Sequence, residues 1–159
     1  MNEPDTPAGA ATAAVDQPRP EHTRPRGVDD ATVDALGKLS EALEVVEHAR
    51  GHLYAFHRLS GTADRTLGEA IDLLREAGHE AVAADVAREL QGRNVLPGRW
   101  TFQVVEEYDD GYYATFKDHE RRIRDELAGG TRHIFEAEMK AREITPGHPG
   151  HEPEPVAGD

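Results

Sequence analysis

The sequence contains no cysteine, which excludes both a disulfide framework and a metal site built from thiolates. It has no apolar run approaching the roughly 20 residues that a membrane-spanning helix needs. Residues 1–27 lack the apolar segment of a secretory signal peptide. We therefore expect a cytoplasmic protein with no membrane partner. Arginine far outnumbers lysine, and alanine and glycine are frequent, a composition that indicates a GC-rich bacterial genome.

Basic residues are scarce as well, with 18 Lys and Arg against 31 Asp and Glu and a net charge of −13. A domain of this sign repels the phosphate backbone, so we expect no nucleic-acid partner. The single basic cluster, residues 121–124, is flanked by Glu120, Asp125 and Glu126. This pattern predicts an exposed helix face with local ion pairs. The acidic run at residues 106–110 also predicts a solvated face.

Proline and aromatic residues divide the chain. Of ten prolines, five precede residue 28 and four follow residue 145, whereas all nine aromatic residues lie between Tyr54 and Phe135. A segment with few apolar residues and many prolines cannot build a core. We therefore predict disordered tails at residues 1–28 and 145–159, and one helical domain at residues 29–144.

Helical periodicity runs through this middle region. Asp29 and Asp30 offer an N-cap for a first helix, which we expect to end at Ser60-Gly61. Its apolar positions recur at helical spacing: Leu36, Leu39, Leu43, Val45, Val46, Ala49, Leu53, Phe56 and Leu59.

A second, broken helix is predicted from about Thr66 to Leu90, interrupted at Gly78 and closed by Gly92. A turn at residues 94–98 precedes a third, long helix that should run to Gly129-Gly130. Thr131 then offers a cap for a short last helix. Because the connections are short, the fold class is predicted to be an all-α, up-down antiparallel helical bundle.

Four polar residues stand out when the helices are drawn as wheels at 100° per residue. His52 lies within the apolar arc of the first helix, and His119 lies within that of the third. Glu138 lies among the apolar residues of the last helix. An up-down-up path puts His52, His119 and Glu138 at one level, and His48 is one turn from His52.

Two interpretations follow from this His/Glu cluster. Imidazole nitrogens and a carboxylate suit zinc, iron or copper, so His52, His119, Glu138 and His48 are candidate metal ligands. Alternatively, the cluster is a hydrogen-bonded network that only satisfies its own polar groups. A di-metal carboxylate site is disfavoured, because its Glu-x-x-His pattern occurs once, at Glu76–His79, and Gly78 interrupts it.

The chain has no Ser-His-Asp arrangement, phosphate-binding glycine loop or dinucleotide fingerprint. We therefore expect a non-catalytic helical module that binds a protein partner or a second copy of itself. The alternative is a bundle that binds a metal ion or small ligand through the internal His/Glu cluster.

Overall fold

The computed structural model describes residues 20–152. Every regular element in this range is a helix, and the only β-type pairing there is an isolated bridge between Leu96 and Arg99. The predicted all-α class is confirmed. Residues 1–19 and 153–159, which belong to the two predicted tails, lie outside the described residues. No helix within the described range combines the length and the apolarity needed to cross a lipid bilayer.

The chain divides into two compact units, and each is described by itself. Unit 1 contains, among the described residues, 20–42 and 118–152. Unit 2 contains residues 43–117. Two helices contribute residues to both units: α2 (Asp30–Glu76) and α5 (Ala114–Ala128).

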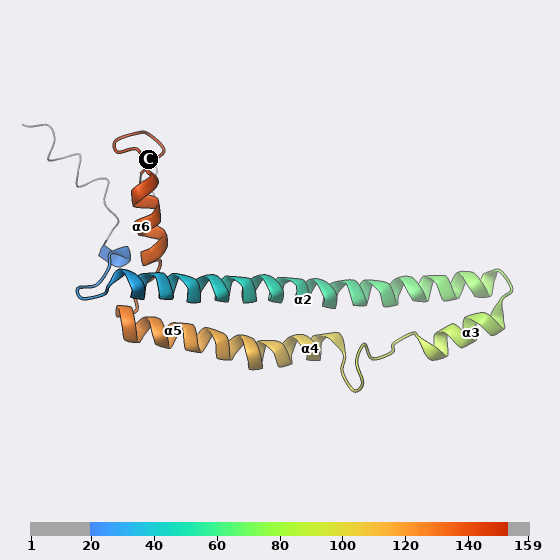
Figure 1. Ribbon diagram of the computed structural model, residues 1–159. Helices are drawn as coiled ribbons and strands as arrows, with labels where there is room; N and C mark the ends of the chain where they lie inside the picture. The colour runs from blue at the N-terminus through green and yellow to red at the C-terminus, as the bar shows by residue number, and fades with distance from the viewer. Residues whose placement is uncertain (1–19, 153–159) are drawn as a thin grey trace, which may run out of the picture. The chain divides into compact units, whose positions relative to one another are not determined.

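Helix α2 is 47 residues long and continues through Ser60-Gly61, so the predicted end at that point is wrong (Figure 1). A glycine inside a helix costs only about 1 kcal/mol, which packing along a long helix readily offsets. The helix ends instead before Gly78, whose φ of +83° is the left-handed conformation that glycine tolerates best. The first half of the predicted broken helix is therefore the end of α2. Its second half is α3 (Glu80–Glu89), which closes at Gly92 as expected.

Unit 1 is built from η1 (Pro20–His22), the start of α2, the end of α5, and α6 (Ile134–Glu143). Its core consists of Val33, Ala128 and Ile134, with Val28, Leu36 and Phe135 packed against them. Gly129 and Gly130, with φ of +58° and +78°, end α5 as predicted. Thr131 is not the N-cap of α6; His133 occupies that position in a left-handed conformation, without a side-chain cap.

Unit 2 pairs the rest of α2 with α3, α4 (Thr101–Tyr108) and the π-helical turn η2 (Asp109–Tyr113). Three hydrogen-bonded pairs, Arg50–Asp109, His57–Thr101 and Glu47–Tyr113, show that α4–η2 runs antiparallel to α2. The buried apolar residues of this unit are Val46, Ile71, Ala83 and Val105.

Candidate functional site

The predicted metal ligands fall into different units. His48 and His52 belong to unit 2, whereas His119 and Glu138 belong to unit 1. The prediction placed His52 level with residue 120, because three helices were expected to run up, down and up. With the second helix merged into α2, the segment that runs antiparallel to α2 within unit 2 is α4–η2. His52, which lies between Arg50 and His57, is therefore opposite a level between Asp109 and Thr101.

His48 and His52 are neighbours on an exposed side of α2. Their Nε2 atoms are 3.1 Å apart and their ring centroids 4.7 Å apart. One imidazole donates to the other, and each ring keeps access to solvent. The predicted pairing one helical turn apart is present, but the prediction that His52 points inward is wrong.

His119 is also exposed, and its Nδ1 lies 3.2 Å from the guanidinium of Arg122. The inward prediction fails here because of η2. A π-helical turn inserts one residue into an α-helix, and one residue rotates every later position by about 100°. Burial is accordingly displaced by one residue at three places: Tyr113 is more buried than Tyr112, Glu120 than His119, and Ala128 than Leu127. Phe116 and Ile123 remain half-buried.

Glu120 is the buried polar residue of unit 1, with 4% of its surface exposed. Its Oε1 accepts hydrogen bonds from Ser40 Oγ at 3.2 Å and from Arg124 Nη1 at 3.1 Å. The Nε of Arg124 is buried without a hydrogen-bond partner among the described residues. The sequence pattern predicts Glu120 on a solvated face, and this prediction is wrong. Glu120, Arg124 and Ala128 are spaced four residues apart, so they lie on the same side of α5. This spacing was the sequence signal that Glu120 lies on the same side as the buried Ala128.

The rest of that basic cluster does form local ion pairs on an exposed face. Arg121 pairs with Asp118 at 2.9 Å, and Arg122 pairs with Glu126 at 3.5 Å. The prediction for the cluster is confirmed for these two arginines and is wrong for Arg124, whose side chain is only 20% exposed.

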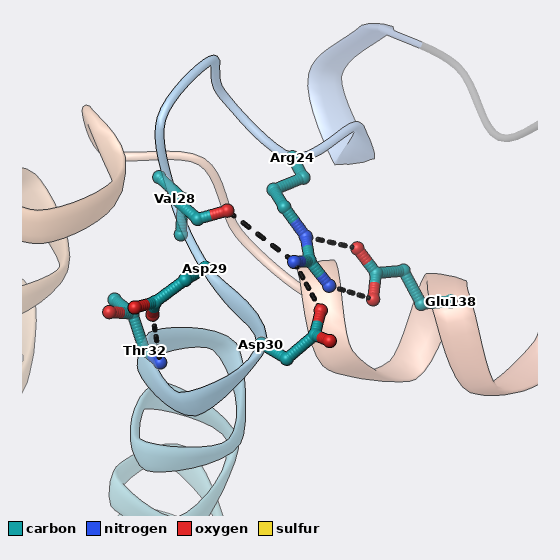
Figure 2. Close-up of polar contacts among 6 residues, drawn as sticks. All are labelled: Arg24, Val28, Asp29, Asp30, Thr32 and Glu138. Carbon is teal, nitrogen blue, oxygen red and sulfur yellow. Dashed lines mark hydrogen bonds and ion pairs between the residues drawn. The ribbon is translucent and has the colours of Figure 1, made fainter.

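Glu138 is half-buried, and its partner is an arginine and not the predicted histidine. Arg24 donates from Nε to Oε1 at 2.8 Å and from Nη2 to Oε2 at 2.7 Å, a bidentate ion pair (Figure 2). Arg24 also contacts Asp30 at 2.6 Å. The hydrogen bonds from Arg24 to Glu138 and then to Asp30 raise the pKa of Arg24 above its ordinary value. The partner comes from residues 20–28, which the sequence assigned to a tail.

The start of α2 is fixed in the same region. The Oδ1 of Asp29 accepts a hydrogen bond from the Thr32 amide at 2.8 Å, so the predicted N-cap at Asp29 is confirmed (Figure 2). Hydrogen bonds from the side chain and the amide of Thr32 lower the pKa of Asp29. Arg24 and Asp29 therefore hold the entry to α2 against α6.

A second polar cluster joins α2 to η2 in unit 2. Arg50 donates from Nε and Nη2 to the two carboxylate oxygens of Asp109, at 2.7 and 2.8 Å. Its guanidinium lies 4.8 Å from the ring centroids of both Tyr54 and Tyr113. The hydrogen bond from Arg50 lowers the pKa of Asp109, with a smaller contribution from Tyr54. Asp109 is therefore a half-buried structural partner, unlike the solvated acid that the sequence predicted.

Metal coordination needs several converging ligands. Among residues 20–152, no group of three or more His, Asp or Glu side chains is placed to hold a metal ion. The closest approach among the predicted ligands is the His48–His52 pair. Glu138 is already engaged by Arg24, and His119 contacts Arg122.

Helix α2 has two distinct faces within unit 2. The inner face packs inside the unit and comprises buried or half-buried residues: Leu43, Val46, Arg50, Leu53, His57, Ser60, Leu67, Ile71 and Leu74. The outer face is offset from it by one residue, about 100° around the helix. Nine of its positions lie in α2, Ala77 follows directly after the helix, and all ten are exposed: Val45, Ala49, His52, Phe56, Leu59, Ala63, Thr66, Ala70, Leu73 and Ala77.

The outer face is mostly apolar despite its exposure, and His52 and Thr66 are its polar members. Val45, Leu59 and Leu73 are 64%, 68% and 64% exposed, and four further positions are alanine. Surface helices normally place polar residues on the side away from their core. An apolar stripe that continues for eight turns on the solvent side is the most unusual surface feature among the described residues, and we take it as the candidate functional site.

A smaller apolar surface lies at the connection between α3 and α4. Trp100 and Phe102 are exposed and pack edge to face, with ring centroids 5.5 Å apart. Beside Trp100, a shallow hollow of about 260 Å³ is lined also by Gly61, Val95 and Thr101. The hollow is open and does not enclose a small molecule.

No protein-family model, curated protein or solved structure matches this chain. The outer face of α2 and the polar clusters described above are therefore the features on which a function has to be based.

Proposed function

We propose that the protein is a non-catalytic helical interaction module that binds a protein partner through the outer face of α2. The observation that carries this proposal is the exposure of Val45, Leu59 and Leu73 on one continuous stripe. Burying one such side chain is worth about 1.5–3 kcal/mol, so a partner helix covering the stripe gains a large driving force. Contiguous exposed apolar surface of this kind marks interaction sites.

The polar clusters support a non-catalytic function. Arg24 is bound to Glu138, Arg50 to Asp109, and Arg124 to Glu120, so each of these charged groups already has a structural partner. A catalytic acid or base must instead face the position of a substrate. The net charge of −13 and the recognition of apolar side chains both favour a protein partner over a nucleic acid.

Site-specific photo-crosslinking in cells tests this proposal. A photoreactive phenylalanine analogue at Leu59 should give a cross-linked protein, because that position lies in the middle of the outer face. The same analogue at Leu127, an exposed leucine of unit 1, is the matched control and should give little. Equal yields at both positions, or none at Leu59, would remove the outer face as a binding site.

A second candidate function is metal binding by the His48–His52 pair, because the two Nε2 atoms are 3.1 Å apart. Two neutral imidazoles one turn apart can share one zinc, copper or iron ion, with water or another group completing the coordination. Elemental analysis of protein purified without a histidine tag tests this. Bound metal should disappear in His52→Ala and persist in His79→Ala, an exposed histidine outside the pair. Loss in His119→Ala or Glu138→Gln would instead restore the four-residue set predicted from the sequence.

A further inference from the structure

We propose that the partner of the outer face is a second copy of this chain, and that the two α2 helices pair as an antiparallel coiled coil. The two-fold axis of this dimer passes close to residue 61. The inference rests on the proposed function and specifies its partner. It is carried by the spacing, the sizes and the charges of the side chains on and beside the outer face.

The spacing is that of a coiled-coil seam. From Val45 to Ala77 the outer-face positions advance by alternating steps of four and three residues without a break. This is the heptad repeat, in which Ala49, Phe56 and their equivalents are a positions and Val45, His52 and theirs are d positions. The pattern is sustained over more than four heptads and about 48 Å of helix.

Side-chain sizes select the antiparallel orientation. When Ala63 is placed opposite Leu59 of a second copy, every layer of the seam combines one small and one large side chain. The layers are Ala49 with Leu73, Phe56 with Thr66, Ala63 with Leu59, Ala70 with His52, and Ala77 with Val45. The a positions are small except Phe56, and the d position opposite Phe56 is the small Thr66. Such alternation fills the space between two helices without voids or overlap.

A parallel pair in register fits poorly. Each a position would then face its own copy, so that Ala49, Ala63 and Ala70 would form thin layers on either side of a Phe56–Phe56 layer. Helices held apart by two phenylalanines leave cavities at the alanine layers, and each cavity costs free energy.

Charged residues beside the outer face support the same register. Arg58, Glu69 and Glu76 form no ion pair with another described residue. In the antiparallel dimer, His48 lies beside Glu76 of the second copy, and Arg58 lies about 7.5 Å along the axis from the level of Glu69 of the second copy. Each contact occurs twice because of the two-fold symmetry. His52 keeps its hydrogen bond to His48 when Ala70 of the second copy covers it.

The orientation can be tested by disulfide trapping, which this chain permits because it has no cysteine of its own. We would prepare the full chain as Ala49→Cys and, separately, as Leu73→Cys. In the antiparallel register, the cysteines of two copies of the same variant are about 36 Å apart along the seam, too far for a disulfide. In a glutathione buffer, the antiparallel dimer should give a disulfide-linked dimer only when the two variants are mixed. A cross-link in either variant alone would overturn the antiparallel register.

The size complementarity can be tested by exchanging Phe56 and Thr66. Phe56→Thr leaves a void in two layers, and Thr66→Phe places two phenylalanines in them. Each single change should weaken the dimer about 100-fold or more by sedimentation equilibrium. The double variant recreates the small–large layers and should return to within about tenfold of the wild type. Failure of this rescue, while helicity measured by circular dichroism is retained, would overturn the inference.

These outcomes separate the inference from the proposed function. A chain that is monomeric by sedimentation at every concentration up to the millimolar range has no self-pairing, and the inference is then wrong. Photo-crosslinking at Leu59 to a different protein would leave the interaction function in place with another partner. Absence of both self-association and cross-linking would overturn both.

Discussion

The two units differ in how completely they cover their own apolar side chains. Among residues 20–152, fourteen large apolar side chains are exposed, and twelve of them belong to unit 2; only Leu127 and Met139 belong to unit 1. Unit 1 surrounds its core with the start of α2, the end of α5, α6 and residues 20–28. Unit 2 leaves one face of α2 and the residues around Trp100 uncovered. Unit 1 therefore covers most of its own apolar side chains, and the binding surface that we propose lies in the unit that does not.

The largest expected difference is in the free energy of unfolding that is lost when one apolar side chain is removed from each unit. Ile134→Ala removes a side chain that is 5% exposed in unit 1, and should lower the free energy of unfolding by about 2–5 kcal/mol. Leu59→Ala, at a site 68% exposed, should change it by less than about 0.5 kcal/mol in dilute, monomeric protein. Urea denaturation of both variants measures this. Similar losses for the two would show that unit 2 covers its leucines as unit 1 does.

The buried carboxylate of unit 1 should produce the next largest effect. Glu120→Ala leaves the guanidinium of Arg124, and the hydroxyl of Ser40, without their acceptor. We expect a loss of about 2–4 kcal/mol, because a charge that loses its partner in a mostly buried position is strongly destabilising. Glu126→Ala is the control, since its pair with Arg122 is exposed, and should cost less than about 1 kcal/mol. Equal costs would place Glu120 on a solvated face after all.

A matched pair of glycines in α2 measures packing in each unit. A Cβ at Gly37 would lie 2.8 Å from Cγ of Phe135, so Gly37→Ala should lose about 1–2 kcal/mol through overpacking. A Cβ at Gly51 would meet no atom within 4 Å, and Gly51→Ala should gain about 0.5–1 kcal/mol from helix propensity. Thermal unfolding of the two variants should show a lower melting temperature for Gly37→Ala and a higher one for Gly51→Ala. A gain at Gly37 would show that α6 does not approach α2 so closely.

Local patterns in the sequence predicted much of this fold. Gly78, Gly92 and Gly129-Gly130 end helices as expected because each adopts a positive φ that other residues avoid. Asp29 caps α2 through a hydrogen bond that spans only three residues. These features depend on neighbouring residues alone, so one sequence contains the information for them.

The candidate site depended on information that a single sequence conceals. The two faces of α2 differ by one residue in phase, so Val45, Ala49 and Leu53 were interpreted as one stripe although Leu53 alone faces inward. The π-helical turn η2 has no clear sequence signal, and it moved the inward position from His119 to Glu120. The Arg24–Glu138 pair joins residues 114 positions apart, a separation that no local pattern can reveal.

The smallest expected effect is a pH dependence of the polar cluster in unit 2. Because Arg50 lowers the pKa of Asp109 below its ordinary value of 3.8, the cluster contributes stability above pH 3.8. That contribution is lost as the pH falls through the lower pKa of the folded state. Asp109→Asn removes the charge, so its melting temperature should lie below that of the wild type at pH 6. The difference should shrink as both proteins are taken toward pH 2.

At alkaline pH the same cluster loses stability as the pH rises, whereas at acidic pH it loses stability as the pH falls. The hydrogen bond from Tyr113 to Glu47 raises the pKa of Tyr113 above its ordinary value of 10.0. Its stabilisation is therefore complete below pH 10 and is lost as the pH rises through the higher pKa of the folded state. Tyr113→Phe lacks this hydrogen bond and should melt below the wild type at pH 8, and the two melting temperatures should converge above pH 10.

Arg50 stays protonated over the whole range, so its own titration contributes to neither the acidic nor the alkaline effect. Melting curves of the wild type and both variants from pH 2 to pH 11, followed by circular dichroism, measure the two effects. Differences that stay constant across the range would mean that these contacts with α2 do not hold η2 in solution.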